Sequence, residues 1–211
     1  MTGILASQAF IEFSTLFILV LTLGLAVVMN RKYARIRSKS LLYWSAGMWF
    51  FAIGVLLEVV FAFGVYSGFL IVLYLFFVAI VVESLAIGSM QLIKSNRLKA
   101  SYYIYSAIAT ILLAYSLYTS KIGNVITNHI VFGALPLFVV ITSSIVTFPA
   151  AAILIAIAAI SYLRKHSAKM LSIIAGVIVV STAGTLYIAA MPEFLYYSEF
   201  IGILLLWVGF I

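Results

Sequence analysis

Cysteine and aspartate are missing from this sequence, and only 8% of its 211 residues are charged. Without cysteine the chain has no disulfide, no thiolate nucleophile and no thiolate-bound metal or iron–sulfur cluster. Without aspartate it has no Ser-His-Asp triad, and we find no nucleophile and base at a spacing that favours a glutamate variant. The sequence leaves enzymatic activity uncertain but favours a protein that is not an enzyme.

Histidine is nearly as scarce as the two missing residue types. The two histidines, His129 and His166, are predicted to lie in loops on opposite sides of the protein. Two ligands placed in this way cannot hold one haem or one metal ion inside a membrane. We therefore expect no cofactor and no metal site.

Apolar residues, by contrast, make up 66% of the chain, and the mean hydropathy is +1.30. A soluble domain of this length cannot bury so much hydrophobic surface. A bilayer core about 30 Å thick needs roughly 20 apolar residues per helix, and seven such runs account for nearly the whole chain. We predict an all-α, polytopic membrane helix bundle with seven transmembrane helices. We expect residues 1-211 to form a single domain that is embedded in the lipid bilayer of the cell membrane.

The predicted spans cover residues 9-29, 41-64, 69-93, 101-119, 137-163, 170-190 and 193-211. These runs lack the alternating pattern of membrane β-barrel strands, and a helix satisfies its own backbone groups in lipid. The first run has no basic segment before it and no cleavage site after it. We expect it to be a retained span and not a signal peptide.

Basic residues predict the orientation of these spans. Eleven of the twelve lysines and arginines follow the first, third and fifth predicted spans, and only Lys121 lies on the other side. Cytoplasmic loops collect basic residues, so we predict an outer N-terminus and a cytoplasmic C-terminus. Because these residues occupy short loops between apolar spans, we do not expect nucleic acid as a partner.

Two of the five glutamates, Glu58 and Glu83, lie within predicted spans. A carboxylate near the centre of a membrane helix costs roughly 2.5 to 3.5 kcal/mol, which makes each one a candidate functional residue. Glu58 shares a helical face with Gly47 and Gly54, and Glu83 shares its face with alanines. Because small residues mark the faces where helices approach closely, both carboxyls are predicted to point into the bundle, at different depths and not as a direct pair.

These two carboxyls have two interpretations. They form two steps of a proton or cation path, with Tyr74 and Tyr187 as relays, or they are protonated side chains that hydrogen-bond a hydroxyl or carbonyl and hold helices in register. Glu12, Glu193 and Glu199 fall near the outer ends of predicted helices and are expected to form an acidic outer rim.

Pro149 lies near the middle of the fifth predicted span. A proline inside a helix frees one carbonyl and bends the helix, so Pro149 is a hinge candidate. The alternative is a static kink in which Ser143, Ser144 and Thr147 satisfy the freed carbonyl. The longest outer connection, residues 120-136, is a candidate lid or partner surface.

A short internal similarity relates the two halves of the chain. Ser38-Lys-Ser-Leu-Leu42, which leads to Ala46-Gly47, resembles Ser167-Ala-Lys-Met-Leu171, which leads to Ala175-Gly176. The offset of 129 residues would map the first three spans onto the last three. Some transporters are built from parallel three-helix repeats joined by a linker helix, with the binding site between the repeats.

Four segments carry a resemblance to a family. They are Tyr43-Trp-Ser-Ala-Gly-Met-Trp-Phe-Phe-Ala-Ile-Gly54, Phe61-Ala-Phe-Gly-Val-Tyr-Ser67, Ser144-Ile-Val-Thr-Phe-Pro149 and Leu204-Leu-Leu-Trp-Val-Gly-Phe210. With these segments the chain resembles a family of uncharacterised archaeal and bacterial seven-span membrane proteins of about this length. The resemblance covers nearly the whole chain and implies the fold, but that family has no assigned function to carry over.

Three functions remain open. The first is a small permease or proton/cation-coupled carrier, which would have a hydrated polar cavity reaching Glu83. The second is a non-catalytic accessory subunit of a larger membrane complex, which would have a dry bundle and an apolar surface fitted to another membrane protein. The third is a membrane sensor or receptor without its own output domain. The ligand is not predicted.

Overall fold

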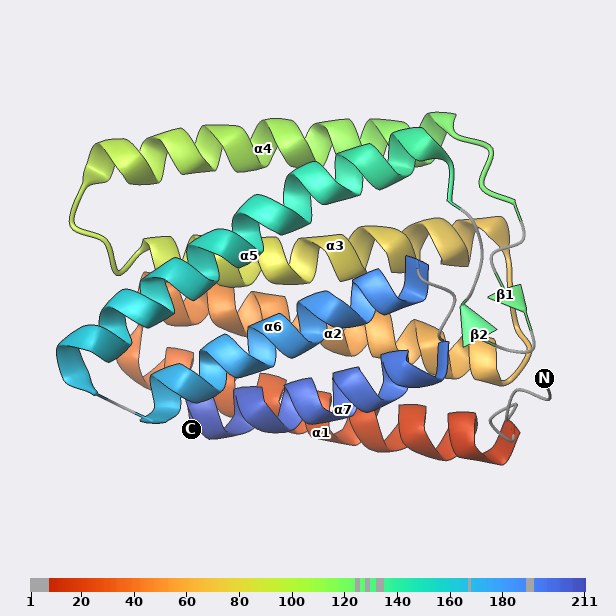
Figure 1. Ribbon diagram of the computed structural model, residues 1–211, viewed down its shortest axis with the longest axis horizontal. Coiled ribbons are helices and arrows are strands. Elements are labelled where there is room, and N and C mark those ends of the chain that lie inside the picture. The colour runs from red at the N-terminus through yellow and green to blue at the C-terminus, as the bar shows by residue number, and fades with distance from the viewer. Residues whose placement is uncertain (1–7, 124–125, 128–129, 132–134, 167, 189–191) are drawn as a thin grey trace.

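The computed structural model describes residues 8–123, 126–127, 130–131, 135–166, 168–188 and 192–211 (Figure 1). Within these residues the chain forms seven α-helices, each overlapping one predicted span. The helices are α1 (Gln8–Ile36), α2 (Lys39–Ala62), α3 (Gly68–Met90), α4 (Asn96–Thr119), α5 (Leu137–Lys165), α6 (Ala168–Ile188) and α7 (Pro192–Phe210). The all-α class that the composition predicts is confirmed.

Helix boundaries follow capping residues more closely than hydropathy. The fourth predicted span starts at residue 101, but α4 begins at Asn96 because the Ser95 hydroxyl accepts a hydrogen bond from the Leu98 amide at 3.4 Å. A serine at this position satisfies one of the donors that the first turn leaves free. At the end of α2, Gly64 has a φ of 81°, and its amide donates to the Phe61 carbonyl. This left-handed glycine turns the chain back towards α3.

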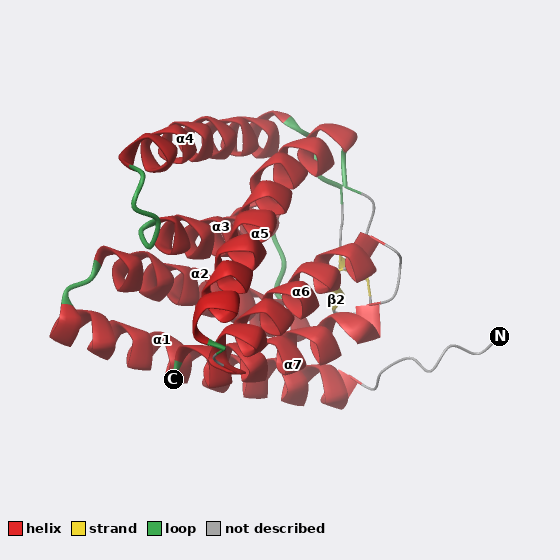
Figure 2. Ribbon diagram, turned by 60° about the vertical axis from the view of Figure 1, so that its left-hand side comes forward, coloured by secondary structure: helices red, strands yellow, loops and turns green. Residues whose placement is uncertain are grey.

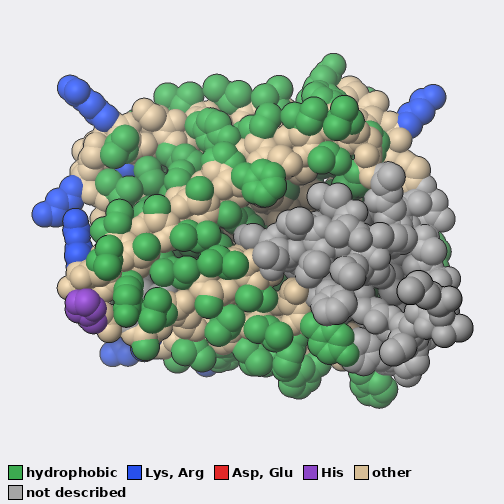
Figure 3. Space-filling view, viewed as in Figure 1, with side chains coloured by type: hydrophobic (Ala, Val, Ile, Leu, Met, Phe, Trp, Pro, Cys, Tyr) green, Lys and Arg blue, Asp and Glu red, His purple; other side chains and the backbone are tan. Residues whose placement is uncertain are grey.

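Five of the helices, α1 to α5, are long and apolar enough over their described residues to cross a membrane. Large apolar side chains face outwards, including Phe13, Phe69 and Phe148, which are 76%, 72% and 66% exposed. Figure 3 shows hydrophobic side chains over much of the visible described face. So much exposed apolar surface is unfavourable in water and suits a bilayer.

Contacts between six of the helices close a ring. Going round it, α1 packs on α2, α2 on α3, α3 on α5, α5 on α6, α6 on α7 and α7 on α1. Helix α4 lies outside this ring, against α3 and α5 (Figures 1 and 2). The main buried apolar cluster fills the inside of the ring, with Leu25, Met48, Ala86 and Ile203 fully buried.

The connection between α4 and α5 carries the only pair of strands in the described part of the chain. Strands β1 (Ile126–Thr127) and β2 (Ile130–Val131) pair antiparallel, and β2 contacts α2. Ile122 and Leu135, on either side of the strands, pack against the cluster that contains Phe61 and Tyr74. The predicted outer loop therefore has structure of its own and covers one end of the bundle.

Candidate functional site

A cluster of four buried polar side chains joins α2, α3 and α7. Glu58 of α2 is 3% exposed, Tyr74 of α3 is 5% exposed, and Tyr196 and Glu199 of α7 are 3% and 6% exposed. The Tyr74 hydroxyl donates a hydrogen bond of 2.6 Å to Oε1 of Glu58. The carboxyls of Glu58 and Glu199 lie within hydrogen-bonding reach of each other. We call these four residues the carboxyl-pair site.

Both carboxyls of this site carry an oxygen without a donor. Oε2 of Glu58 and Oε2 of Glu199 are buried and have no hydrogen-bond partner among the described residues. Buried polar atoms are rarely left unpaired, because each one loses its hydrogen bonds to water. Two ionised carboxylates can only accept, whereas a protonated carboxyl also donates. One proton held between the two side chains would therefore supply the missing donor.

Sequence reasoning missed this pair. Glu58 is buried, as its glycine face predicts, but Glu199 was expected at the outer rim and is instead enclosed by the bundle. Glu199 lies seven residues after the start of α7, about 10 Å along the helix. A signal for this was present, because Tyr196, Glu199, Ile203, Leu206 and Phe210 repeat every three or four residues and are all buried. A stripe with this period marks the buried face of a helix.

Glu83 belongs to a separate site between α3 and α4. Its Oε2 accepts a hydrogen bond of 2.8 Å from the Thr110 hydroxyl, and Ser106, one turn before Thr110 on α4, lies beside this carboxyl. Tyr102 and Tyr105, whose rings stack with centroids 6.1 Å apart, lie within electrostatic range of it. Glu83 is 3% exposed, so its predicted inward position is confirmed. A hydroxyl partner on the neighbouring helix is typical of a buried carboxyl that fixes the register of two helices, here α3 and α4.

The two acidic sites are separated by apolar residues. On α3 every residue from 75 to 82 is apolar, which places Tyr74 about 13 Å from Glu83 along the helix axis. The cavity at the centre of the ring has a volume of only about 10 Å³ and is lined by apolar side chains, among them Leu85 and Leu206. An open carrier would have a polar cavity that reaches Glu83. The central cavity is instead small and apolar.

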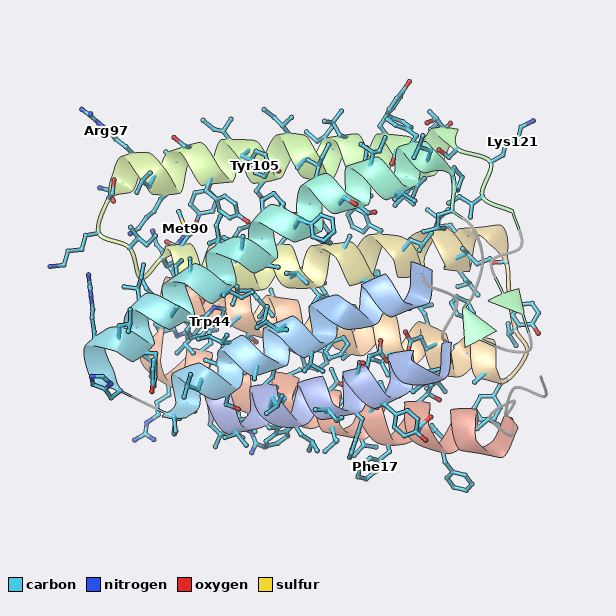
Figure 4. All side chains as sticks on the ribbon, viewed as in Figure 1. Phe17, Trp44, Met90, Arg97, Tyr105 and Lys121 are labelled. Carbon is cyan, nitrogen blue, oxygen red and sulfur yellow. The ribbon has the colours of Figure 1, made fainter. Side chains whose placement is uncertain are left out.

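Pro149 lies inside α5, which continues unbroken from Leu137 to Lys165. Because proline has no amide hydrogen, the carbonyl four residues earlier, that of Ile145, loses its helical donor. The Tyr105 hydroxyl of α4 donates to this carbonyl at 2.6 Å, and Tyr105 lies between α4 and α5 (Figure 4). Of the three predicted donors, Ser143 and Thr147 bond other carbonyls of their own helix.

The structure describes two of the remaining candidates. Glu12 is half-buried near the start of α1, and His166 is exposed after α5. The side chains of Glu193 and Tyr187 are outside those that the structure describes, and so is His129. Of the three glutamates predicted for the acidic outer rim, Glu199 is the one that the structure buries inside the bundle.

Close contacts repeat between the two halves of the ring. A Cβ at Gly47 of α2 would lie 3.1 Å from Leu85 Cδ2 and 3.3 Å from Ser84 Cβ. A Cβ at Gly176 of α6 would lie 3.2 Å from both Leu206 Cδ2 and Leu205 Cβ. The α2 and α6 positions differ by 129 residues, and the α3 and α7 positions by 121.

The same two offsets relate a second set of contacts. Gly88 of α3 faces the Trp44 side chain and the Ser40 carbonyl, and Gly209 of α7 faces the Ile173 side chain and the Lys169 carbonyl. The arrangement of the helices shows the same repeat. If α1, α2 and α3 are exchanged with α5, α6 and α7, the same pairs of helices are in contact around the ring. The short sequence similarity is therefore accompanied by equivalent packing, and Leu85 and Leu206 are equivalent residues in the central cavity.

Comparisons of the chain with protein-family models, with curated proteins and with solved structures find no match. What this protein does must therefore follow from the chemistry of its own sites.

Proposed function

We propose that the chain spans the cell membrane seven times, with its N-terminus outside and its C-terminus in the cytoplasm. Helices α6 and α7, with 21 and 19 residues, are about 31 and 28 Å long, close to the thickness of a bilayer core. The clustered basic residues support the orientation, since they gather at one end of the bundle while Lys121 lies at the other (Figures 3 and 4).

We propose further that the protein is a small membrane carrier whose two three-helix halves, α1 to α3 and α5 to α7, move against each other. The observation that carries this proposal is the pair of equivalent contact sets around one central cavity. In transporters built from parallel repeats, the binding site lies near the midplane between the repeats. Helix α4, outside the ring, takes the place of the linker.

The proposal requires this structure to be a closed conformation. Leu85 and Leu206 both line the central cavity, which is large enough for about one water molecule. Transport would open this apolar centre first towards one side of the membrane and then towards the other. A dry, apolar centre is also what the accessory-subunit hypothesis predicts, and this observation makes that function the second candidate.

Thiol labelling distinguishes the two functions, because the native chain contains no cysteine. Leu85→Cys and Leu206→Cys would each be reconstituted in lipid vesicles and exposed to a membrane-impermeant thiol reagent on either side. A carrier that alternates is expected to react from both sides. Leu113→Cys is the matched control, since Leu113 is fully buried but belongs to the cluster between α3, α4 and α5.

Reaction of both central cysteines from each side, with no reaction at the control, supports the carrier. Reaction from one side only, or from neither side, contradicts alternating access. The latter result favours the accessory subunit, whose core stays closed.

A further inference from the structure

We propose that the carboxyl-pair site binds one proton and that this proton holds the two halves of the carrier together at the outer end. The inference rests on the proposed carrier function and adds the coupling ion and the gate. Glu58 belongs to the first half and Glu199 to the second, so their contact crosses the boundary between the halves. All four residues of the site are buried.

The geometry favours one proton shared by Glu58 and Glu199 over two ionised carboxylates. Two ionised carboxylates within hydrogen-bonding reach repel each other strongly where water is absent. Tyr74 of α3 and Tyr196 of α7 lie within electrostatic range of both carboxyls, and no Lys, Arg or His among the described residues interacts with either carboxyl. With no cation to neutralise two negative charges, one shared proton leaves a single charge and supplies a hydrogen-bond donor to a site in which two buried carboxyl oxygens have none.

The position of the site makes it a gate. Glu58 lies four residues before the end of α2, or about 6 Å from that end, and Tyr74 is held against Phe61 with ring centroids 5.7 Å apart. Strands β1 and β2 lie at the same end, and β2 contacts α2 (Figure 1). A proton released here goes to the outer side, because apolar residues separate the site from Glu83 and the basic end.

The proton-transfer step balances without any co-reactant. The carboxyl of one glutamate, hydrogen-bonded to the carboxylate of the other, loses its proton to water and becomes a second carboxylate. The hydrogen bond between α2 and α7 is replaced by repulsion of two like charges, which pushes the outer ends of the two halves apart. Uptake of one proton restores the bond and closes the outer end.

Infrared difference spectroscopy of the full chain in lipid vesicles tests the proposal. The wild type is expected to show one carboxyl band that appears and disappears as the pH changes. The band should vanish completely in both Glu58→Gln and Glu199→Gln, because the two side chains form one binding site. Glu83→Gln is the matched control, since Glu83 is equally buried but has a hydroxyl donor in Thr110, and this variant should leave the band in place.

Tyr74→Phe gives a second measurement that leaves both carboxyls intact. Removing the hydroxyl that donates to Oε1 of Glu58 should shift the frequency of the same band without abolishing it. No titrating band in the wild type, or a band that survives in both glutamine variants, overturns the proton site. The infrared measurement does not depend on helix movement, so it is independent of the thiol-labelling experiment. If no proton site is found but the central cysteines react from both sides, the carrier function stands without this proton. If the proton site is found but the cysteines do not react from both sides, the site belongs to a static bundle.

Discussion

At the scale of single residues, the bundle provides partners for polar groups that lipid cannot satisfy. The Ile145 carbonyl, freed by Pro149, receives the Tyr105 hydroxyl, and Thr110 donates to Glu83. Within a bilayer each unpaired backbone group costs several kcal/mol. These hydrogen bonds therefore explain how a proline and a carboxyl are accommodated inside apolar helices. Among the described side chains, two oxygens of the carboxyl-pair site lack such partners.

Tyr105→Phe is expected to destabilise the protein by about 1 to 2 kcal/mol, because the Ile145 carbonyl then has no donor. Pro149→Ala returns an amide hydrogen to that carbonyl. In the Pro149→Ala background the tyrosine substitution should therefore cost much less. Reversible unfolding of the four proteins in mixed micelles measures this double-mutant cycle, and equal costs in both backgrounds would show that the Tyr105 hydrogen bond does not compensate for the proline.

The sequence allowed the inward positions of Glu58 and Glu83 to be predicted, because the glycines and alanines on their helical faces are local information. It did not allow the Glu58 and Glu199 contact to be predicted, since the two residues lie on helices that are far apart in the chain. Glu199 was assigned by its distance from the start of a predicted span, while its buried stripe with Tyr196 and Ile203 was overlooked. Tertiary packing, which no single helix encodes, decides which glutamates meet.

At the scale of helices, small residues let neighbouring backbones approach closely. The Ser40 hydroxyl donates to the Gly88 carbonyl at 2.7 Å between α2 and α3, and the Ser172 hydroxyl donates to the Leu205 carbonyl at 2.6 Å between α6 and α7. Membrane helices associate through such close packing and hydroxyl bonds, because lipid provides little hydrophobic driving force. The equivalent helix pairs of the two halves thus use the same kind of contact.

Alanine at Gly88 or Gly209 is expected to destabilise the protein by about 1 to 3 kcal/mol through overpacking. The added methyl group would overlap Trp44 in the first case and Ile173 in the second. Gly68→Ala is the control, because nothing lies within 4 Å of its added carbon. Thermal unfolding in detergent measures all three, and loss of stability in only one of the first two would contradict equivalent packing of the halves.

The extents of the helices were harder to predict than their number. Hydropathy places the end of the first span at residue 29, but α1 continues to Ile36 through basic residues. Lys32 Nζ then donates to the Phe210 carbonyl at 2.8 Å, which pairs a cation with the free carbonyl end of α7. Hydropathy marks where lipid begins, whereas the end of a helix depends on partners such as this one, which come from elsewhere in the fold.

At the scale of the whole molecule, charge is distributed unevenly along the long axis of the bundle. Arg97 and Lys121 lie at opposite ends (Figure 4), and the other basic residues gather with Arg97, in the connections after α1, α3 and α5. A basic end of this kind favours the cytoplasmic side and its anionic lipids. The carboxyl-pair site lies towards the other end, which the proposed orientation exposes to the outside.

Single cysteines at these two positions test the orientation, and the absence of native cysteine removes any background. In intact cells a membrane-impermeant thiol reagent should label Lys121→Cys directly and should label Arg97→Cys only after the membrane is opened. The opposite pattern would invert the topology and would place the proton gate on the cytoplasmic side. Labelling of both cysteines in intact cells would mean that the two ends of the bundle are not separated by a membrane, and the carrier hypothesis would fail with the topology.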